Sequence, residues 1–515
     1  MRHRAWLVGS LFFVSPLLAR AESYVVAADG DDGNSGLAGS PWATLQHAAD
    51  TVGPGDTVTV EPGDYAGFYL TTSGAEGAPI TFTAKPGVSI TGENEQTGQD
   101  GINIEDTNNG EVISYVVVEG FTVNGMARAG IRTAVSSHVT IRKNRTDQNG
   151  VWGILTGFAD DIVIEENECS RSGEQHGIYF SNSADRPVIR KNLVWGNNQN
   201  GIHMNGDASL GGDGIISDAL VEANILYGNG QAGGSAINCD GVQSSRIRNN
   251  LIYDTHASGI SLYQIDGAEP ATDNVVANNI VLVATDGRWA LNIREGSSGN
   301  HVYNNILWND HPFRGSIDIA MDALPGFASN NNLMLDRFTL NGDDVIGLAE
   351  WQSATGQDAA SSTAEPLFVD AAAGNYRSAP NSPAVDEGTS TDAPTVDIEG
   401  VARPQGAAFD IGAYELCDGD GCEMGAGGAG GGAGGNGSGG GGNGSGGDSA
   451  GGNGNGGEGG SGSGASGGGS GDGGGEGGCG CRTAGGGGTG RWAVWMVGVA
   501  LAVARLRRRG RPSFE

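Results

Sequence analysis

The sequence predicts an all-β solenoid, in which short parallel strands stack in successive coils. A short apolar strand that ends in Asn, or once in Gly, recurs eight times between residues 115 and 305, at steps of 23 to 32 residues. A second strand, usually opened by Gly-Ile, follows most of these corners. The repeat is too short for a βαβ crossover, so one set of strands per repeat indicates a solenoid. The corner residues are Gly120, Asn144, Asn167, Asn192, Asn224, Asn250, Asn279 and Asn305.

The corner Asn residues suit tight turns between strands. Asn tolerates the left-handed backbone conformation and bonds nearby backbone groups through its side chain. Stacked Asn side chains also bond to one another. We therefore expect the corner Asn residues to occupy equivalent positions and to form a ladder along the solenoid.

This pattern resembles the right-handed parallel β-helix of the pectin-lyase type over residues 24–415. We expect one β-helix domain over residues 22–415. Residues 41–52 are predicted to form an N-terminal capping helix, begun by Ser40 and Pro41, that covers the first coil. Residues 365–388 and 397–415 resemble the closing segment of such proteins, with a buried strand expected at 409–415.

Both ends of the chain have features of an exported protein. Residues 1–21 combine a basic start, an apolar run and the small-residue pattern Ala19-Arg20-Ala21, as in a signal peptide. Residues 416–490 are mostly Gly with Ser and Asn, which predicts a flexible linker. Residues 491–515 hold an apolar run followed by an Arg-rich tail.

The linker, the pair Cys479 and Cys481, the hydrophobic helix and the Arg tail together resemble the myxobacterial C-terminal sorting signal. The resemblance implies processing near Cys479 or Cys481 and attachment to the outer envelope (the outer membrane) through the C-terminal region. One alternative is a plain C-terminal transmembrane anchor, for which the apolar run is short. Another is secretion after processing.

Charge and cysteine usage narrow the partners. The formal net charge of −32 argues against nucleic acid and against simple electrostatic capture of polyanions. Cys417 and Cys422 are close enough for a small disulfide loop in an oxidising envelope; Asp418 and Asp420 alternatively form a weak cation site. Cys239 falls at an inward position, which predicts a buried thiol.

The second strand of five successive coils predicts one distinctive face. Strict alternation along the strands at 177, 201, 236, 259 and 290 sends Ile, Phe, Met, Cys and Leu inward. Solvated outer faces usually carry Thr, Ser, Lys and Glu, but this one carries His, Tyr, Asn, Asp and Arg. We interpret it as a ligand-binding face, roughly 20 Å long over four coil steps, which suits an extended oligosaccharide. This outward row comprises Tyr179, Ser181, His203, Asn205, Asn238, Asp240, Ser261, Tyr263, Asn292 and Arg294.

Roles follow from the chemistry of these side chains. His203 and Tyr179, one coil apart, are predicted to be the catalytic proton-transfer groups, because an imidazole exchanges protons near neutral pH. Asp207 and Asp213, in the long insertion at 207–218, are candidate ligands for calcium, the one cofactor we expect. The residues predicted to bind substrate are Asn205, Asn238, Asp240, Tyr263, Asn292 and Arg294.

Two functions of different classes fit this row. The first is a cell-surface lyase or C5-epimerase of uronate-containing extracellular polysaccharide, which needs a base, an acid and a cation to neutralise the carboxylate. Arg186, or a cation held by Asp207, Asp213 or Asp240, is the predicted neutraliser, and Arg294 would serve a neighbouring subsite. Clustered Asp residues, as hydrolysis requires, are less evident. The alternative is a non-catalytic surface adhesin or glycan-binding module.

Overall fold

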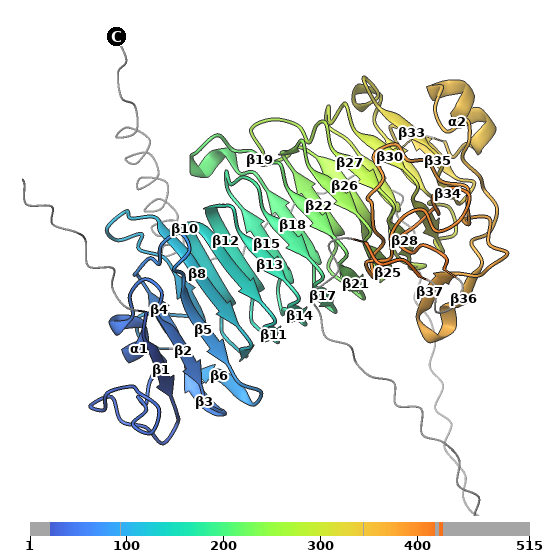
Figure 1. Ribbon diagram of the computed structural model, residues 1–515. Helices are drawn as coiled ribbons and strands as arrows, with labels where there is room; N and C mark the ends of the chain where they lie inside the picture. Colours follow the sequence, from blue (N-terminus) through green and yellow to red (C-terminus); the bar gives the residue numbers. More distant parts are fainter. Residues whose placement is uncertain (1–20, 93, 343, 418–421, 426–515) are drawn as a thin grey trace, which may run out of the picture.

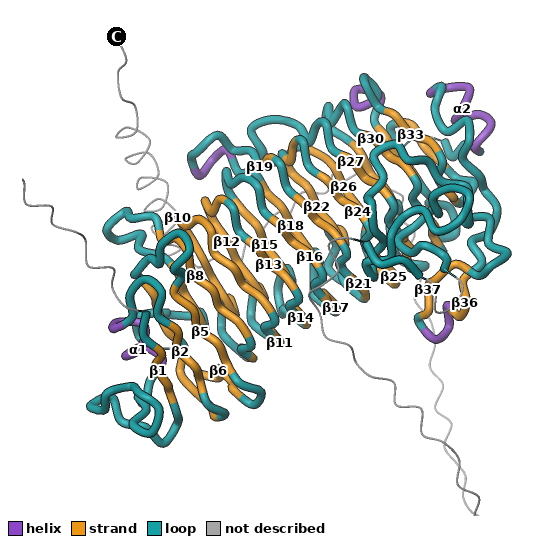
Figure 2. Tube along the Cα trace, viewed as in Figure 1, coloured by secondary structure: helices purple, strands orange, loops and turns teal. Residues whose placement is uncertain are grey.

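The predicted parallel β-helix is confirmed by the computed structural model, which describes residues 21–92, 94–342, 344–417 and 422–425. Its strands stack into coils along one axis, and an irregular segment lies against the last coils (Figure 1). A 22-stranded sheet and an 11-stranded sheet wrap around the core, and the described helices are short and few (Figure 2).

Each complete coil contributes three strands, all paired in parallel with those of the next coil. The pre-ladder strands, which precede the corner Asn, are β2 (Thr57–Val60), β5 (Ile80–Ala84), β8 (Ile113–Glu119), β13 (Val163–Glu165), β16 (Val188–Arg190), β20 (Leu220–Glu222), β24 (Arg246–Arg248), β27 (Val275–Ala277), β30 (His301–Tyr303) and β33 (Ala328–Asn330). The first of them also pairs with β1 (Ser23–Val26).

The post-ladder strands follow the corner and form the 11-stranded sheet. They are β3 (Gly63–Ala66), β6 (Val88–Gly92), β9 (Thr122–Asn124), β11 (Arg145–Asp147), β14 (Glu168–Ser170), β17 (Leu193–Trp195), β21 (Ile225–Tyr227), β25 (Leu251–Thr255), β28 (Ile280–Val283), β31 (Ile306–Asn309) and β34 (Leu333–Met334).

The site strands complete each coil and carry the outward row. They are β4 (Phe68–Leu70), β7 (Ile102–Ile104), β12 (Trp152–Asp160), β15 (Ile178–Ser181), β18 (Ile202–Asn205), β22 (Ser235–Asp240), β26 (Ser258–Tyr263), β29 (Leu291–Ile293), β32 (Ile317–Ile319) and β35 (Phe338–Leu340). The long strand β10 (Ala129–Arg142) pairs both as a site strand and as a pre-ladder strand.

The Asn ladder is confirmed, and it is buried. The side-chain oxygen of Asn192 accepts from the backbone N–H and the amide of Asn167, while its own amide donates to Ile164 O and to Asn224 Oδ1. The same pattern runs from Asn144 to Asn305 and continues to Asn332, one corner beyond the predicted set. Because each amide bonds to the next coil, the ladder fixes the coil-to-coil register.

The prediction that the ladder Asn itself adopts the left-handed backbone conformation is wrong by one residue. The left-handed conformation belongs to the residue before it, such as Lys143 (φ 55°) or Lys191 (φ 55°). The ladder Asn supplies hydrogen bonds instead. The turn conformation and the ladder hydrogen bonds are thus supplied by two successive residues. The side chain of the left-handed residue points away from the core and can contact any segment that packs on the corner.

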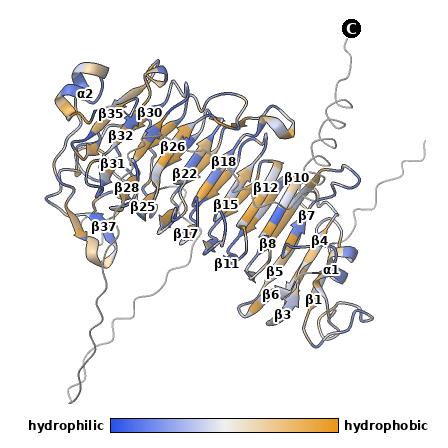
Figure 3. Cartoon of the chain, turned by 180° about the vertical axis from the view of Figure 1, so that it is seen from behind, coloured by the Kyte–Doolittle hydropathy of each residue, from blue (hydrophilic) through white to orange (hydrophobic). Residues whose placement is uncertain are grey.

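The outer face of the pre-ladder strands shows an ordinary solvated pattern. Glu and Arg alternate from coil to coil, and neighbours form ion pairs such as Arg190–Glu165 at 2.7 Å and Arg248–Glu222 at 2.9 Å. Hydrophobic and hydrophilic residues are interspersed along the strands (Figure 3), and the apolar ones, such as Ile164, Ile189 and Val221, are fully buried. The charges on this face therefore neutralise one another within the fold.

The N-terminal cap is shorter than predicted. Helix α1 spans Leu45–Thr51, and Thr44 is its N-cap, with the Thr44 side chain accepting from the backbone N–H of His47. Thr44 takes the capping role given to Ser40, because the backbone N–H groups of residues 43 and 44 are held by Asp32. The helix still buries Leu45 at the end of the first coils, as a cap should.

The coils end earlier than predicted, at β35. Helix α2 (Leu348–Thr355) packs at this end, with Trp351 fully buried against Phe338. Residues 365–417, the closing segment, then run back along the last coils (Figure 1). They contain one antiparallel hairpin of β36 (Phe368–Asp370) and β37 (Asn375–Ser378). Residues 409–415 are not a strand, although Ile411 and Ala413 are buried.

The closing segment is attached through the αL side chains of the corners. Asn249, Asn278, Asn304 and Asn331 each precede a ladder Asn and adopt positive φ. Their amides donate to backbone carbonyls of residues 396, 410, 389 and 387. An Asn-Asn pair at a corner thus serves two surfaces, the ladder inside and the closing segment outside.

A buried ion pair completes this attachment. Arg403 donates to Glu415 Oε2 at 2.7 Å and to Gly412 O at 2.9 Å, and both charged side chains are almost fully buried. Arg403 also reaches Asn249 Oδ1 at 3.4 Å, so the pair touches a coil corner. The segment and the coils are therefore joined by groups that have no access to water.

The predicted disulfide is present between Cys417 and Cys422, with a Cα–Cα separation of 5.6 Å. Cys239 is a buried free thiol, as predicted. Among the described residues, no helix is long and apolar enough to cross a membrane. Residues 1–20, 418–421 and 426–515 lie outside the described part. These residues include the predicted signal peptide except Ala21, most of the predicted linker, and the predicted sorting signal.

We expect Asn192→Leu to lower the free energy of unfolding by about 1–3 kcal/mol, because the Asn167 amide loses a buried acceptor and Asn224 Oδ1 and Ile164 O each lose a buried donor. Denaturant unfolding measures the loss. Asn198→Leu is the control, since Asn198 is half-exposed and its side chain makes a single hydrogen bond, to Glu174 O. Equal stability of the two variants would exclude a stabilising ladder.

We expect Glu415→Gln to loosen the closing segment, because it leaves the Arg403 charge buried without a counter-ion, a change that costs about 3–5 kcal/mol in comparable cases. Limited proteolysis within residues 365–417 and the melting temperature report it. Glu399→Gln, which breaks the exposed Arg377–Glu399 pair, should cost less than about 1 kcal/mol. A segment that resists protease equally in both variants would contradict the assignment.

Candidate functional site

The structure aligns the outward row as predicted. Tyr179 pairs with His203, His203 with Asn238, Asn238 with Ser261, and Ser261 with Asn292. The alternate residues of these strands point inward and are completely buried, from Ile178 to Ile293. The register and the facing of all five strands therefore follow from the alternation of the sequence.

Most side chains of this row are buried in the structure. His203 is 4% exposed and Asn238 1% exposed, while Tyr179 and Arg294 are half-buried. Loops that connect the site strands close over the row. Alternation along a strand predicts which side chains point away from the core. It does not predict whether connecting loops cover those side chains.

Two of these loops meet over one end of the row. The backbone N–H of Ala208 donates to Asp266 O at 2.9 Å, and that of Ala268 donates to Gly214 O at 2.9 Å. The predicted insertion at 207–218 thus pairs with the loop at 264–268. This second loop is held from below, because the Asp240 carboxylate accepts from the backbone N–H groups of residues 265, 266 and 267.

These contacts change the assignment of Asp240. Burial raises the pKa of its carboxyl, and the backbone N–H donors of the loop oppose the rise. Its oxygens are committed to the loop, so its direct contact with a ligand would require the loop to move. In this structure Asp240 positions the loop over the row.

His203 lies in a chain of polar contacts with a second histidine. His176 Nδ1 is 3.3 Å from the backbone N of Asn200 and 3.2 Å from its side-chain amide nitrogen, and both of these are donors. His176 Nδ1 must therefore be an acceptor and Nε2 carry the proton. Nε2 is 3.1 Å from His203 Nδ1, to which it donates. The proton of neutral His203 is thereby assigned to its Nε2.

Burial keeps both imidazoles neutral. It lowers the pKa of His203 to about 3, and it lowers the pKa of His176 well below the usual value, with the neighbouring His203 adding to the effect. The His203 ring also stacks on Tyr179 with centroids 5.1 Å apart, and Tyr179 stacks on Trp152 at 5.7 Å. The predicted pair His203 and Tyr179 is thus in contact.

Three buried polar atoms beside this pair have no hydrogen-bond partner among the described residues. They are His203 Nε2, Asn205 Oδ1 and Asn238 Oδ1. His203 and Asn205 alternate on β18, and Asn238 is paired with His203 on the next coil, so the three side chains are neighbours. With the proton assigned above, they present one donor and two acceptors, which we call the polar cluster.

Further contacts link the polar cluster to its neighbours in the row. The Asn205 amide donates to Tyr179 Oη at 3.1 Å and approaches Asp266 Oδ2 at 3.5 Å. Arg294 donates to Asn292 Oδ1 at 3.0 Å and is paired with Asp318. Tyr263 is buried in β26, beside Asp240 in the row.

The candidate metal ligands are not gathered into a cluster. Asp207 caps a 3₁₀ turn at Ala208–Leu210 and accepts from Ser209 N and Oγ, and Asp213 accepts from Ile215 N at 3.3 Å. Over the described ranges, no group of three or more His, Cys, Asp or Glu side chains is arranged to hold a metal ion. Calcium binding by Asp207 and Asp213 stays a prediction.

His176 flanks the row, as its place in the sequence beside Ile178 indicated, but its contact with His203 could not be predicted. It has the same parity as the inward residues Ile178 and Phe180, so alternation would send it into the core. The strand begins only at Ile178, and His176 belongs to the preceding turn, which points its ring outward. The available signal was its position immediately before a Gly-Ile strand start.

Comparisons with known proteins agree with this architecture. Residues 54–211 match the family model described as periplasmic copper-binding protein (NosD). The chain is similar to the uncharacterized protein YwoF of Bacillus subtilis (strain 168), with 26% identity over 440 residues, 70% of this chain and 91% of that protein. The crystal structure of pectate lyase Pel9A is similar with a TM-score of 0.51 and 15% identity, covering 76% of this chain and 96% of that one. At that identity the likeness shows the fold.

We expect the His203 imidazole to titrate near pH 3 rather than near 6.5, its usual value. The unfolded chain takes up this proton first, so the stability that His203 contributes is complete above pH 6.5 and declines as the pH falls toward 3. NMR titration of the imidazole signals measures the pKa, and His203→Gln identifies the signal and should make the decline shallower. A His203 signal that titrates near pH 6.5 would show that the ring is solvated.

Proposed function

We propose that this is an exported β-helix protein that binds an extracellular polysaccharide at the polar cluster when the loops at 207–218 and 264–268 move away from it. The observation that supports this most directly is the set of unpaired buried atoms on His203, Asn205 and Asn238. Buried polar atoms are nearly always paired, so an unpaired set of one donor and two acceptors indicates a partner that both donates and accepts. Sugar hydroxyl groups have that property. The half-buried rings of Trp152 and Tyr179 mark the side of the cluster nearest the surface.

The ion pairs of this face favour an uncharged glycan over a uronate polymer. The site-strand Arg132 is paired with Glu105, Arg294 with Asp318, and the flanking Arg186 with Asp161 at 2.7 Å. A uronate carboxylate would have to compete with a protein carboxylate for each of these guanidinium groups. This supports the glycan-binding module over the lyase or epimerase.

The lyase or C5-epimerase remains a second candidate because Tyr179 and His203 stack. In the tautomer set by His176, His203 Nε2 is a donor toward the cluster. It fits hydrogen bonding to a sugar oxygen better than proton abstraction, and a pKa of about 3 makes the neutral ring a weak base. A catalytic role would therefore place the base on Tyr179 or require a different histidine tautomer.

The copper named for the matched family does not fit the histidines of this face. A metal ligand needs a free ring nitrogen lone pair. His176 Nδ1 is taken by Asn200 and its Nε2 donates to His203, which occupies His203 Nδ1. No ring nitrogen of the pair is left as an acceptor, so we derive no copper chemistry here.

Delivery to the cell surface is the remaining part of this proposal. It depends on residues 1–21 as a signal peptide and residues 491–515 as the attachment to the outer envelope. The match to a family described as periplasmic supports export.

Binding can be tested with purified protein, by affinity electrophoresis in gels that contain neutral polysaccharides or polyuronates. We expect retardation by a neutral polymer, and a loss of about 5- to 30-fold in affinity for Asn205→Ala, because the lost bond is worth about 1–2 kcal/mol. Asn198→Ala, at a half-exposed position, should bind as the wild type does.

Turnover of polyuronate to an unsaturated product, abolished in His203→Ala, would instead establish the lyase. Epimerisation without cleavage, followed by NMR of the polymer, would establish the epimerase. Equal binding by Asn205→Ala and wild type would remove the polar cluster as the site.

A further inference from the structure

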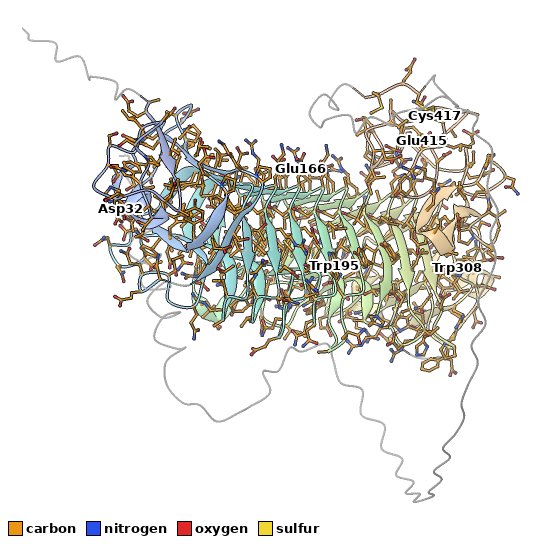
Figure 4. The ribbon with its side chains drawn as sticks, turned by 90° about the horizontal axis from the view of Figure 1, so that it is seen from below. Asp32, Glu166, Trp195, Trp308, Glu415 and Cys417 are labelled. Atoms are coloured by element: carbon orange, nitrogen blue, oxygen red, sulfur yellow. A yellow bond between two sulfur atoms is a disulfide. The ribbon has the colours of Figure 1, made fainter. Side chains whose placement is uncertain are left out.

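A large cavity lies away from the outward row, between the post-ladder strands and the closing segment. Its volume is about 700 Å³. Strands β25, β28 and β31 form one wall, and residues 365–376 form the other. Figure 4 shows Trp308 near the hairpin of the closing segment, and Trp195 farther along the stack. The cavity exists because the closing segment touches the corners of the coils and leaves the strand ends uncovered.

Four aromatic side chains line this cavity, together with aliphatic ones. Tyr376 of the closing segment lies 5.0 Å from Tyr253, centroid to centroid, and Phe368 meets Tyr376 edge-on at 5.5 Å. Trp308 is half-buried, and within the described part of the chain no other ring stacks on it. Its partner in the preceding coil is Leu282, and part of the indole lines the cavity, where a ligand can reach it.

The neighbouring aromatic residues of the same sheet differ in this respect. Trp195, Tyr227 and Tyr253 stack along the coils at 5.8 and 5.0 Å, and Arg171 lies over the outer face of Trp195 at 5.3 Å. Both faces of Trp195 are occupied by the protein itself. Stacking within this row is structural, and Trp195 is a matched comparison for Trp308.

Three carboxylates surround the aromatic wall. Asp254, Asp310 and Glu365 are exposed, and among the described residues none of them makes a side-chain hydrogen bond or an ion pair. The lining contains no Lys or Arg. Burial, with Asp254 and Asp310 adding to it, raises the pKa of Tyr376, so the field inside the cavity is negative. On the pre-ladder face, by contrast, Arg residues pair with the carboxylates.

This geometry points to a binding site for a protonated amino sugar within a glycan. The apolar face of a pyranose ring packs on Trp308, and its ammonium group is attracted by the carboxylates and by the aromatic faces. A cavity of this size accommodates a short oligosaccharide, whereas one Lys side chain would leave most of it empty. The negative field excludes uronate. The site shares no residue with the polar cluster, so it stands or falls independently of the function proposed above.

Isothermal titration of the full chain with glucosamine oligomers tests this inference, at a pH that keeps the amine protonated. We expect these to bind at least about tenfold more tightly than N-acetylated oligomers of equal length, and to weaken with salt. Galacturonate oligomers should not bind. Trp308→Ala should lower the affinity at least about tenfold, and Asp310→Asn should lower it while leaving the fold intact.

Trp195→Ala is the control for loss of a surface Trp on the same sheet, and Tyr179→Phe is the control for the polar cluster. Neither should change glucosamine binding. Absence of binding, equal affinity for the acetylated oligomers, equal loss in Trp195→Ala, or equally tight binding of an oligolysine peptide would each overturn the assignment. Loss of binding in Tyr179→Phe alone would move the amino sugar to the outward row.

Discussion

Each coil of this protein is held to the next by the amide of a buried Asn, and the rest of the structure depends on that interaction. The Asn192 amide bonds to the coil before it and the coil after it, so neither coil can slip by one residue without leaving amides unpaired in the core. A fixed register keeps Tyr179, His203 and Asn238 side by side on separate coils. Both proposed binding sites are consequences of rows that the ladder holds in line.

The corner serves the closing segment as well. The ladder Asn faces inward, and the residue before it takes the left-handed conformation and faces outward. In the early coils that residue is Lys143, Glu166 or Lys191, which suit a solvated corner. In the last coils it is Asn, and its amide bonds the closing segment. The change from a charged residue to Asn at this position therefore marks the coils whose corners are covered by the closing segment.

Much of the fold could be read from the sequence because strand alternation and repeat length are local properties. The inward set from Ile178 to Ile293, the register of the outward row and the contact of Tyr179 with His203 all follow from them. The burial of the row could not be read in this way. It depends on loops at 207–218 and 264–268 that meet each other, and their pairing is set by Asp240 and by contacts between residues far apart in sequence. The Asn-Asn pairs at 249, 278, 304 and 331 were visible in the sequence, but their second role emerges only once the closing segment is in place.

The two proposed sites differ in whether their carboxylates are paired with Arg residues, and this difference explains why they would select different sugars. On the site strands, Arg132 and Arg294 are matched to Glu105 and Asp318, and the polar cluster between them holds neutral groups. Its selectivity must come from hydrogen-bond geometry, since there is no net local charge to attract or repel a polymer. In the cavity beside Trp308 the carboxylates form no ion pair within the described part of the chain, so a cation is favoured and a uronate is repelled. The net negative charge of the chain favours cationic ligands at both sites. Because Arg residues neutralise the carboxylates on the site strands but not those around the cavity, only the cavity offers carboxylates that can attract a charged ligand.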